Sequence, residues 1–169
     1  MPDGFGGARD SFTPLRGEDF DAFRDAARGE LRQALDRLGH FHLDPLSDGW
    51  AYRRFGEGPV RGIGAIAREL PWRWVLWSFP GELSLADWKR VLRFTHLRLE
   101  RKLQDPRCIR IEATANVGVP GAAAVLESLG FELEGVMRCY GPRGETHRLY
   151  AIVQPPLAQH AAEDLHVGA

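Results

Sequence analysis

The chain has 169 residues, of which 44% are hydrophobic and 27% charged, which is the composition of one globular domain. Its 22 basic and 23 acidic side chains give a net charge of -1, which excludes a protein that binds polyanions through an overall positive surface. Residues 1–10 are Gly-rich and 155–169 follow a Pro-Pro pair, and neither segment shows apolar periodicity. We therefore expect one domain over 11–154 between two flexible tails.

The two cysteines, Cys108 and Cys139, are isolated in the sequence and form no CxxC pair. This pattern argues against a structural zinc site and is typical of a reduced compartment. No apolar leader begins the chain, and no apolar run reaches the ~18–20 residues needed to span a bilayer. We expect a cytoplasmic protein with no membrane partner.

The histidines offer little evidence for a metal site. His40 and His42 lie close to Asp44 and could supply two ligands, but no third ligand follows nearby, so we interpret them as exposed loop residues. His96 and His147 stand singly in a predicted helix and a predicted strand, where we expect satisfied polar positions. No metal cofactor is predicted.

Secondary structure in the first part of the chain follows from apolar periodicity. A short strand is predicted at 11–16, where Pro14 favours an edge position. Apolar residues recur at three- and four-residue steps over 18–38, which predicts one amphipathic helix. Extended segments at 50–55 and 60–67 flank a Gly-rich turn and predict a β-hairpin.

The middle of the chain has the clearest strand and helix signals. Aromatic residues alternate over 72–79, which predicts a covered central strand with its three tryptophans in the core. Ser84 and Asp87 have the spacing of a capping box, and an apolar stripe follows over 85–103. This segment is the best-defined predicted helix.

The last part of the chain alternates short elements. Strands are predicted at 108–115, 131–140 and 146–153, with a short helix at 120–129. A helix that joins the strand at 72–79 to the next strand makes a right-handed crossover, so these two strands should be parallel. We expect a mixed α/β domain with its site at the ends of the parallel pair.

Residues 119–132, including Glu127-x-x-Gly130-Phe131, resemble the GNAT family of N-acetyltransferases. The continuation over 134–151 resembles the C-terminal hairpin of small GNAT-like proteins of phages and bacteria. The resemblance covers about 12–153 in element order, but only the C-terminal third in motif. It implies an α/β (α+β) fold, with a mixed, mostly antiparallel sheet of six or seven strands and a central parallel pair flanked by helices.

The resemblance also implies an activity, the transfer of an acetyl or other acyl group from CoA to an amine by direct attack. Acetyl-CoA would be the co-substrate, with its diphosphate at the loop that enters the helix at 85–103. The implied cofactor-binding candidates are Trp77, Ser78, Phe79, Gly81, Leu83 and Ser84. The residues placed to move protons beside the strand gap are Glu112 and Tyr140, for which surface pairing is the competing interpretation.

Several residues depart from the family pattern. The phosphate loop has a single glycine, Gly81. It also places Glu82 at the position where the CoA diphosphate, with its two negative charges, would lie. Val119 and Leu126 stand where the family often has Asn and Tyr. The alternative function is therefore a catalytically degenerate GNAT-fold interaction or structural module, such as a phage virion or accessory protein, with a second copy or an assembly protein as partner.

The predicted helix at 85–103 carries six basic and two acidic side chains, a net charge of +4. This stripe could hold the CoA 3′-phosphate, a nucleic acid or an acidic partner. A solvated helix face is the favoured interpretation, because the aromatic residues that a nucleic-acid module would expose are predicted to be in the core. Nucleic acid is therefore not an expected partner.

Overall fold

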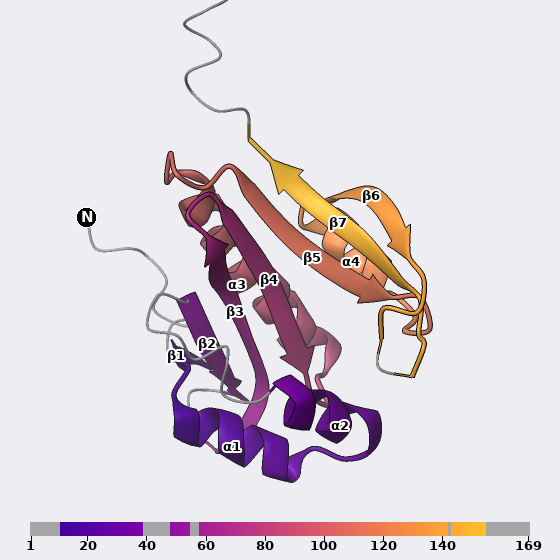
Figure 1. Ribbon diagram of the computed structural model, residues 1–169. Coiled ribbons are helices and arrows are strands. Elements are labelled where there is room, and N and C mark those ends of the chain that lie inside the picture. The colour runs from indigo at the N-terminus through magenta and orange to yellow at the C-terminus, as the bar shows by residue number, and fades with distance from the viewer. Residues whose placement is uncertain (1–10, 39–47, 55–57, 142, 155–169) are drawn as a thin grey trace, which may run out of the picture. The chain divides into compact units, whose positions relative to one another are not determined.

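The computed structural model describes residues 11–38, 48–54, 58–141 and 143–154 (Figure 1). The predicted tails and the predicted loop histidines, His40 and His42, lie outside the described residues. In chain order the elements are β1 Phe12–Pro14, α1 Gly17–Ala26, α2 Gly29–Leu38, β2 Asp48–Arg53, β3 Val60–Leu70, β4 Arg73–Pro80, α3 Leu85–Leu103, β5 Arg110–Asn116, α4 Ala122–Ser128, β6 Glu132–Met137 and β7 His147–Val153.

The strands form a seven-stranded mixed sheet in the order β1-β2-β3-β4-β5-β7-β6. The pairs β1–β2, β2–β3, β5–β7 and β6–β7 are antiparallel. The carbonyl oxygen of Trp72 accepts hydrogen bonds from the amides of Ile109 (3.1 Å) and Arg110 (3.2 Å), so β4 and β5 begin side by side and run parallel. With α3 as the connection, this confirms the predicted crossover and the predicted fold class.

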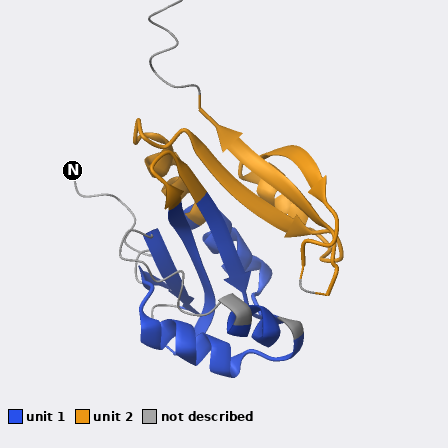
Figure 2. Ribbon diagram, in the orientation of Figure 1, with its two compact units in different colours: residues 1–68, 75–94 blue, residues 69–74, 95–169 orange. Residues whose placement is uncertain are grey.

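The chain divides into two compact units, which Figure 2 shows in blue and orange. The first comprises 1–68 and 75–94, and the second comprises 69–74 and 95–169. In the first unit, α1 and α2 contribute apolar side chains to a core that also includes residues of β2 and β3. Its buried members are Phe20, Phe23, Leu35, Ala51, Val60 and Ile63.

In the second unit, β7 lies between β5 and β6, and α4 packs against the same small sheet. Tyr150 of β7 is fully buried, and its hydroxyl donates a 3.1 Å hydrogen bond to the Glu127 carboxylate of α4. Apolar residues of β5 and α4 complete this core, among them Ile111, Ala113 and Leu126. The C-terminal motif that carried the resemblance is therefore one helix packed on one hairpin and β5.

The single helix predicted over 18–38 is wrong, because the structure has two helices there. Ala27 has extended backbone angles (φ -69°, ψ 150°), and Gly29 has a positive φ of 57°. Glycine adopts this left-handed conformation without the steric cost that a Cβ would impose. The break lets both helices turn their apolar faces to one core, although the three- and four-residue periodicity continues across it.

The predicted strands are all present, but the strand predicted over 131–140 ends at Met137, so Tyr140 lies after β6 and not in it. One prediction about side chains also fails. β1 pairs with β2 alone, as the edge prediction required, and β2 pairs with β3 as the predicted hairpin. Trp74 is buried and Trp77 is partly buried, but Trp72 is 44% exposed, so its placement in the core is wrong. Trp72 lies in the turn before β4, where strand alternation no longer directs the side chain inward. None of the helices in the described part of the chain is long and apolar enough to cross a bilayer.

Candidate functional site

The predicted capping box is present at the beginning of α3. The amide of Asp87 donates to Ser84 Oγ at 3.2 Å, while Asp87 Oδ2 accepts from the Ser84 hydroxyl at 2.6 Å and from its amide at 3.3 Å. The Tyr52 hydroxyl of β2 donates to the other carboxylate oxygen, Oδ1, at 2.6 Å. Asp87 is therefore a buried carboxylate, 1% exposed, with both oxygens hydrogen-bonded.

Charge at this helix end is set by one carboxylate and two guanidiniums. Hydrogen bonds from Ser84 and Tyr52 lower the pKa of Asp87 to about 2, so it is ionised at neutral pH. Burial, and then the bond to Asp87, raise the pKa of Tyr52. Arg90 Nη1 lies 3.4 Å and Arg54 Nε 3.7 Å from Asp87 Oδ1, which gives this cluster a net charge of -1 + 2 = +1.

Four of the predicted cofactor-binding residues lie on β4 or directly after it, in different surroundings. Trp77 and Phe79 have ring centroids 5.8 Å apart and pack against the core of the first unit. Ser78, between them in sequence, is exposed, and Leu83 is half-buried in the loop before α3. Trp77 and Phe79 thus pack on the core, and of these four candidates Ser78 and Leu83 are the ones more available to a ligand.

The backbone amides of the other two predicted residues already have acceptors within the protein. Gly81 N donates to the carbonyl oxygen of Arg61 at 2.9 Å, and a Cβ on Gly81 would lie 2.8 Å from that oxygen. The Ser84 amide is bonded to Asp87. The single loop glycine is therefore explained by its contact with β3, and Asp87 occupies the end of α3 where the helix dipole favours an anion.

Glu112, the predicted carboxylate of β5, is held in ion pairs. Its Oε1 accepts from Arg110 Nε at 2.5 Å and lies 3.8 Å from Arg73 Nη1. Arg110 also binds both carboxylate oxygens of Glu134, and this contact raises the pKa of Arg110. Glu112 thus belongs to an ion-pair network that joins β5 to Arg73 of β4 and to Glu134 of β6.

Tyr140, the second predicted proton-transfer residue, lies at the other end of this small sheet. Its side chain is 58% exposed, and its ring centroid is 5.3 Å from that of His147. His147 pairs with Asn116, the last residue of β5, whereas Glu112 lies four residues earlier, which is about 13 Å along a strand. The structure therefore brings Tyr140 to His147 and not to Glu112.

His147 is a candidate site residue that sequence reasoning missed. The expectation of a satisfied polar position is wrong, because Nδ1 is buried and has no hydrogen-bond partner in the part of the chain that the structure describes. The available signal was the hairpin, since Tyr140 follows its first strand and His147 begins its second. His96, in contrast, pairs with Glu100 of the same helix at 3.3 Å, as expected of a polar helix position.

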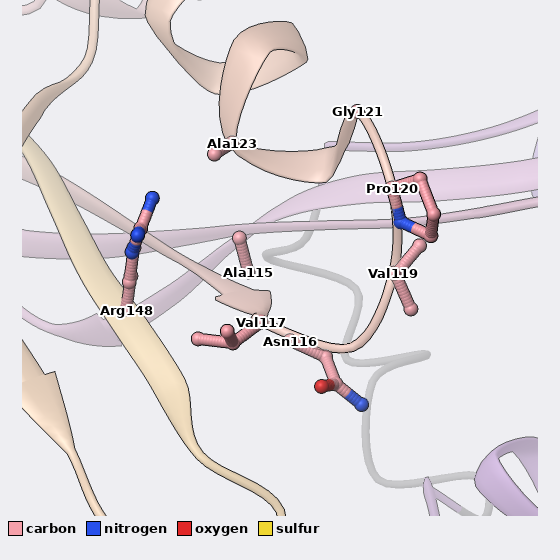
Figure 3. A pocket seen from close by; sticks show the side chains of 8 residues that line it. All are labelled: Ala115, Asn116, Val117, Val119, Pro120, Gly121, Ala123 and Arg148. Atoms are coloured by element: carbon pink, nitrogen blue, oxygen red, sulfur yellow. The ribbon is translucent and has the colours of Figure 1, made fainter.

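A hollow of about 200 Å³ lies at the end of β5 within the second unit (Figure 3). Arg148 stands on β7 opposite Ala115, and Ala123 of α4 borders the same space. The loop from β5 to α4 closes it, fixed by a 2.8 Å hydrogen bond from Gly118 N to Asn116 Oδ1. The full lining is Ala115, Asn116, Val117, Val119, Pro120, Gly121, Ala123 and Arg148.

Comparison with known proteins gives matches among solved structures. No protein-family model matches the sequence, and no curated protein sequence matches it significantly. The structure resembles a ribosomal-protein-S5-alanine acetyltransferase from Vibrio fischeri, with a TM-score of 0.61 and 16% identity over 85% of this chain and 94% of that one. The fold is that of the GNAT acetyltransferases.

Two further GNAT-fold structures show the same relationship. A GNAT-family acetyltransferase from Bacillus anthracis has a TM-score of 0.62 and 13% identity, over 84% of this chain and 93% of that chain. A ribosomal L7/L12 α-N-protein acetyltransferase, determined in complex with coenzyme A, has a TM-score of 0.61 and 12% identity, over 85% of this chain and 94% of that chain. These likenesses confirm the predicted GNAT fold.

Among the residues that the structure describes, no three His, Cys, Asp or Glu side chains gather as a metal site.

Proposed function

We propose that this GNAT-fold chain is an acyltransferase that moves an acetyl or other acyl group from CoA to an amine. The supporting observation is the parallel β4–β5 pair joined by α3, in a chain that spans 94% of several acetyltransferases of this fold. The similar structures include enzymes named for a ribosomal-protein alanine and for spermidine, which are both amine acceptors. An amine is therefore the proposed acceptor class.

Transfer by direct attack needs a neutral amine and a proton for the departing sulfur. When bound, CoA supplies the acyl thioester. We assign proton transfer to Tyr140 and His147, because the phenol is exposed, the rings adjoin and His147 Nδ1 has no hydrogen-bond partner among the described residues. Glu112 is about 13 Å along the strand from this pair and is engaged by Arg110, so we assign it to the ion-pair network of the sheet.

Side chains at the beginning of α3, and not backbone amides, would bind the CoA diphosphate. Arg54 and Arg90 are 46% and 38% exposed, and each guanidinium has five donors, enough to contact Asp87 and a phosphate together. Guanidinium binds phosphate oxygens in pairs. These two arginines would hold the diphosphate beside Leu83 and Ser84, in place of the glycine amides that serve many nucleotide loops.

A second candidate function is a GNAT-fold interaction or structural module without CoA chemistry, such as a phage virion or accessory protein. The specific observation in its favour is the ionised Asp87 carboxylate at the end of α3, where a bound anion would otherwise lie. Val119, 50% exposed, and Leu126, 8% exposed, also provide no polar group at their positions. In this case the fold would provide a surface that binds a partner protein.

A titration with acetyl-CoA and with CoA separates the two functions. Calorimetry should show saturable binding, and ligand at 100 times its dissociation constant should stabilise the fold by about 2.7 kcal/mol. Arg54→Ala and Arg90→Ala should each weaken binding at least tenfold, whereas Lys89→Ala, a matched loss of charge on α3, should change it little. Absence of heat and of thermal shift at millimolar ligand overturns the acyltransferase and favours the module.

A further inference from the structure

Arg148 is an exposed cation of β7 in the second unit. In the sheet register its neighbours on either side are Ala115 of β5 and Val136 of β6. Within the described residues, no carboxylate forms an ion pair with its side chain. Arg148 is exposed and borders the hollow, where Asn116 is the one other polar side chain in the lining, and Asn116 Oδ1 accepts the Gly118 amide.

Tyr150, the next residue of β7 on the face that carries Arg148, has a carboxylate partner on α4, and Arg148 has none among the described residues. Tyr150, two residues further on β7, projects to the same side of the sheet, and its hydroxyl is bonded to Glu127 of α4. Ala123 lies four residues before Glu127, on the same helix face and one turn away. Between α4 and the sheet, the Glu127 carboxylate thus faces Tyr150, whereas the Ala123 methyl group and the hollow face Arg148.

We propose that this hollow binds a small aliphatic carboxylate. The carboxylate would take the acceptor position beside Arg148, and the hydrocarbon part would lie on Ala115, Val117 and Pro120 (Figure 3). A guanidinium accepts a carboxylate through two parallel hydrogen bonds. The hollow of about 200 Å³ has room for a short chain. This proposal goes beyond the proposed acyl transfer, and its test uses no CoA.

Charge favours a carboxylate over phosphate in this position. One guanidinium balances one negative charge, whereas a phosphate dianion would bring a second charge to a hollow in which Arg148 is the one charged lining residue among those described. An alkylamine would bring a second cation to Arg148. The ligand class is therefore defined by one negative charge and a short apolar body.

The test is an NMR titration of the full chain with sodium acetate, propionate and butyrate at constant ionic strength. The amides of Ala115, Ala123 and Arg148 should shift saturably, with a dissociation constant on the order of millimolar, as fits so small a ligand. Because the hydrocarbon part would lie on Ala115, Val117 and Pro120, affinity for the carboxylate should rise up to about fourfold with each added methylene. Inorganic phosphate and butylamine serve as the comparison ligands and should bind at least tenfold more weakly.

Two variants and a control locate the binding. Arg148→Met keeps the apolar stem and should lose at least tenfold in butyrate affinity. Ala123→Glu places a carboxylate one turn before Glu127, where it should pair with Arg148 and block butyrate. Ala124→Glu, at the exposed neighbouring position, should leave binding unchanged. No saturable shift at about 50 mM butyrate, unchanged affinity in Arg148→Met, or tighter binding of phosphate overturns the proposal.

Discussion

The Tyr52 hydroxyl donates a 2.6 Å hydrogen bond to Oδ1 of Asp87, so strand β2 and the first turn of α3 share one buried carboxylate. Tyr52→Phe removes the donor and leaves that oxygen buried without this hydrogen bond. Such a loss costs about 1–3 kcal/mol of unfolding free energy, which urea denaturation measures. Tyr140→Phe, at a 58% exposed side chain, should change the unfolding free energy by less than about 0.5 kcal/mol. Equal effects of the two variants would contradict the importance of the buried bond.

Asp87 also makes stability depend on pH in the acid range. Its pKa is lowered from 3.8 to about 2 by the bonds from Ser84 and Tyr52, so its ionised form favours the folded state. This contribution is complete above the ordinary pKa and is lost as the pH falls through the folded-state pKa, with a total of about 2.5 kcal/mol. Asp87→Asn lacks it at every pH.

The measurement compares the unfolding free energies of the wild type and Asp87→Asn at several pH values. The wild type should lose up to about 2 kcal/mol more than the variant between pH 5 and pH 2, because other carboxylates titrate alike in both proteins. A constant difference across this range would show that Asp87 does not carry the acid dependence.

The close approach of the β4–α3 loop to β3 makes Gly81 sensitive to substitution. A Cβ at Gly81 would lie 2.8 Å from the backbone oxygen of Arg61, which cannot move aside as a side-chain end can. Gly81→Ala should therefore destabilise the fold by about 1–3 kcal/mol. Gly62→Ala is the matched control, because its Cβ would meet Phe79 O at 3.6 Å, an ordinary contact. Urea denaturation should rank the two variants in this order, and the reverse order would refute the packing explanation.

Local signals predicted much of this fold. The capping box at Ser84 and Asp87 and the apolar stripe of α3 depend on residues a few positions apart, so the helix was visible in the sequence. The break near Ala27 was not visible, because apolar periodicity continues across it and only the shared core selects two helices. Element type is thus set by neighbours in sequence, whereas this boundary is set by packing.

The candidate sites depend on contacts that a single sequence does not show. Tyr52 and Asp87 are 35 residues apart and meet only because α3 packs beside β2. The hollow at Arg148 exists because α4 presents a small residue there, and strand alternation gives only the face on which Arg148 lies. Glu112 lies on β5 and Tyr140 follows β6, and their separation depends on the register of β5 with β7, which a single sequence does not show.

The two cysteines should differ sharply in reactivity. Cys108 is 1% exposed, and burial raises the pKa of its thiol to about 11, whereas Cys139 is exposed. The thiolate is the reactive form. At pH 8, a disulfide reagent such as DTNB should therefore modify one thiol promptly and the second only after unfolding. Cys139→Ser should abolish the prompt reaction and Cys108→Ser should preserve it, and two prompt thiols in the wild type would contradict the burial of Cys108.

Glu82 tests the proposed diphosphate position at the beginning of α3. This exposed side chain lies in the loop between Gly81 and Ser84, where it would repel the two negative charges of a CoA diphosphate. Glu82→Gln should tighten CoA binding about threefold to tenfold at low ionic strength, as measured by calorimetry. The difference should shrink at high salt, because exposed charges are screened. Glu18→Gln, at an exposed residue of α1, is the matched control and should leave the affinity unchanged. If the wild type binds CoA and Glu82→Gln binds it equally, the diphosphate lies elsewhere, while the acyltransferase proposal itself would stand.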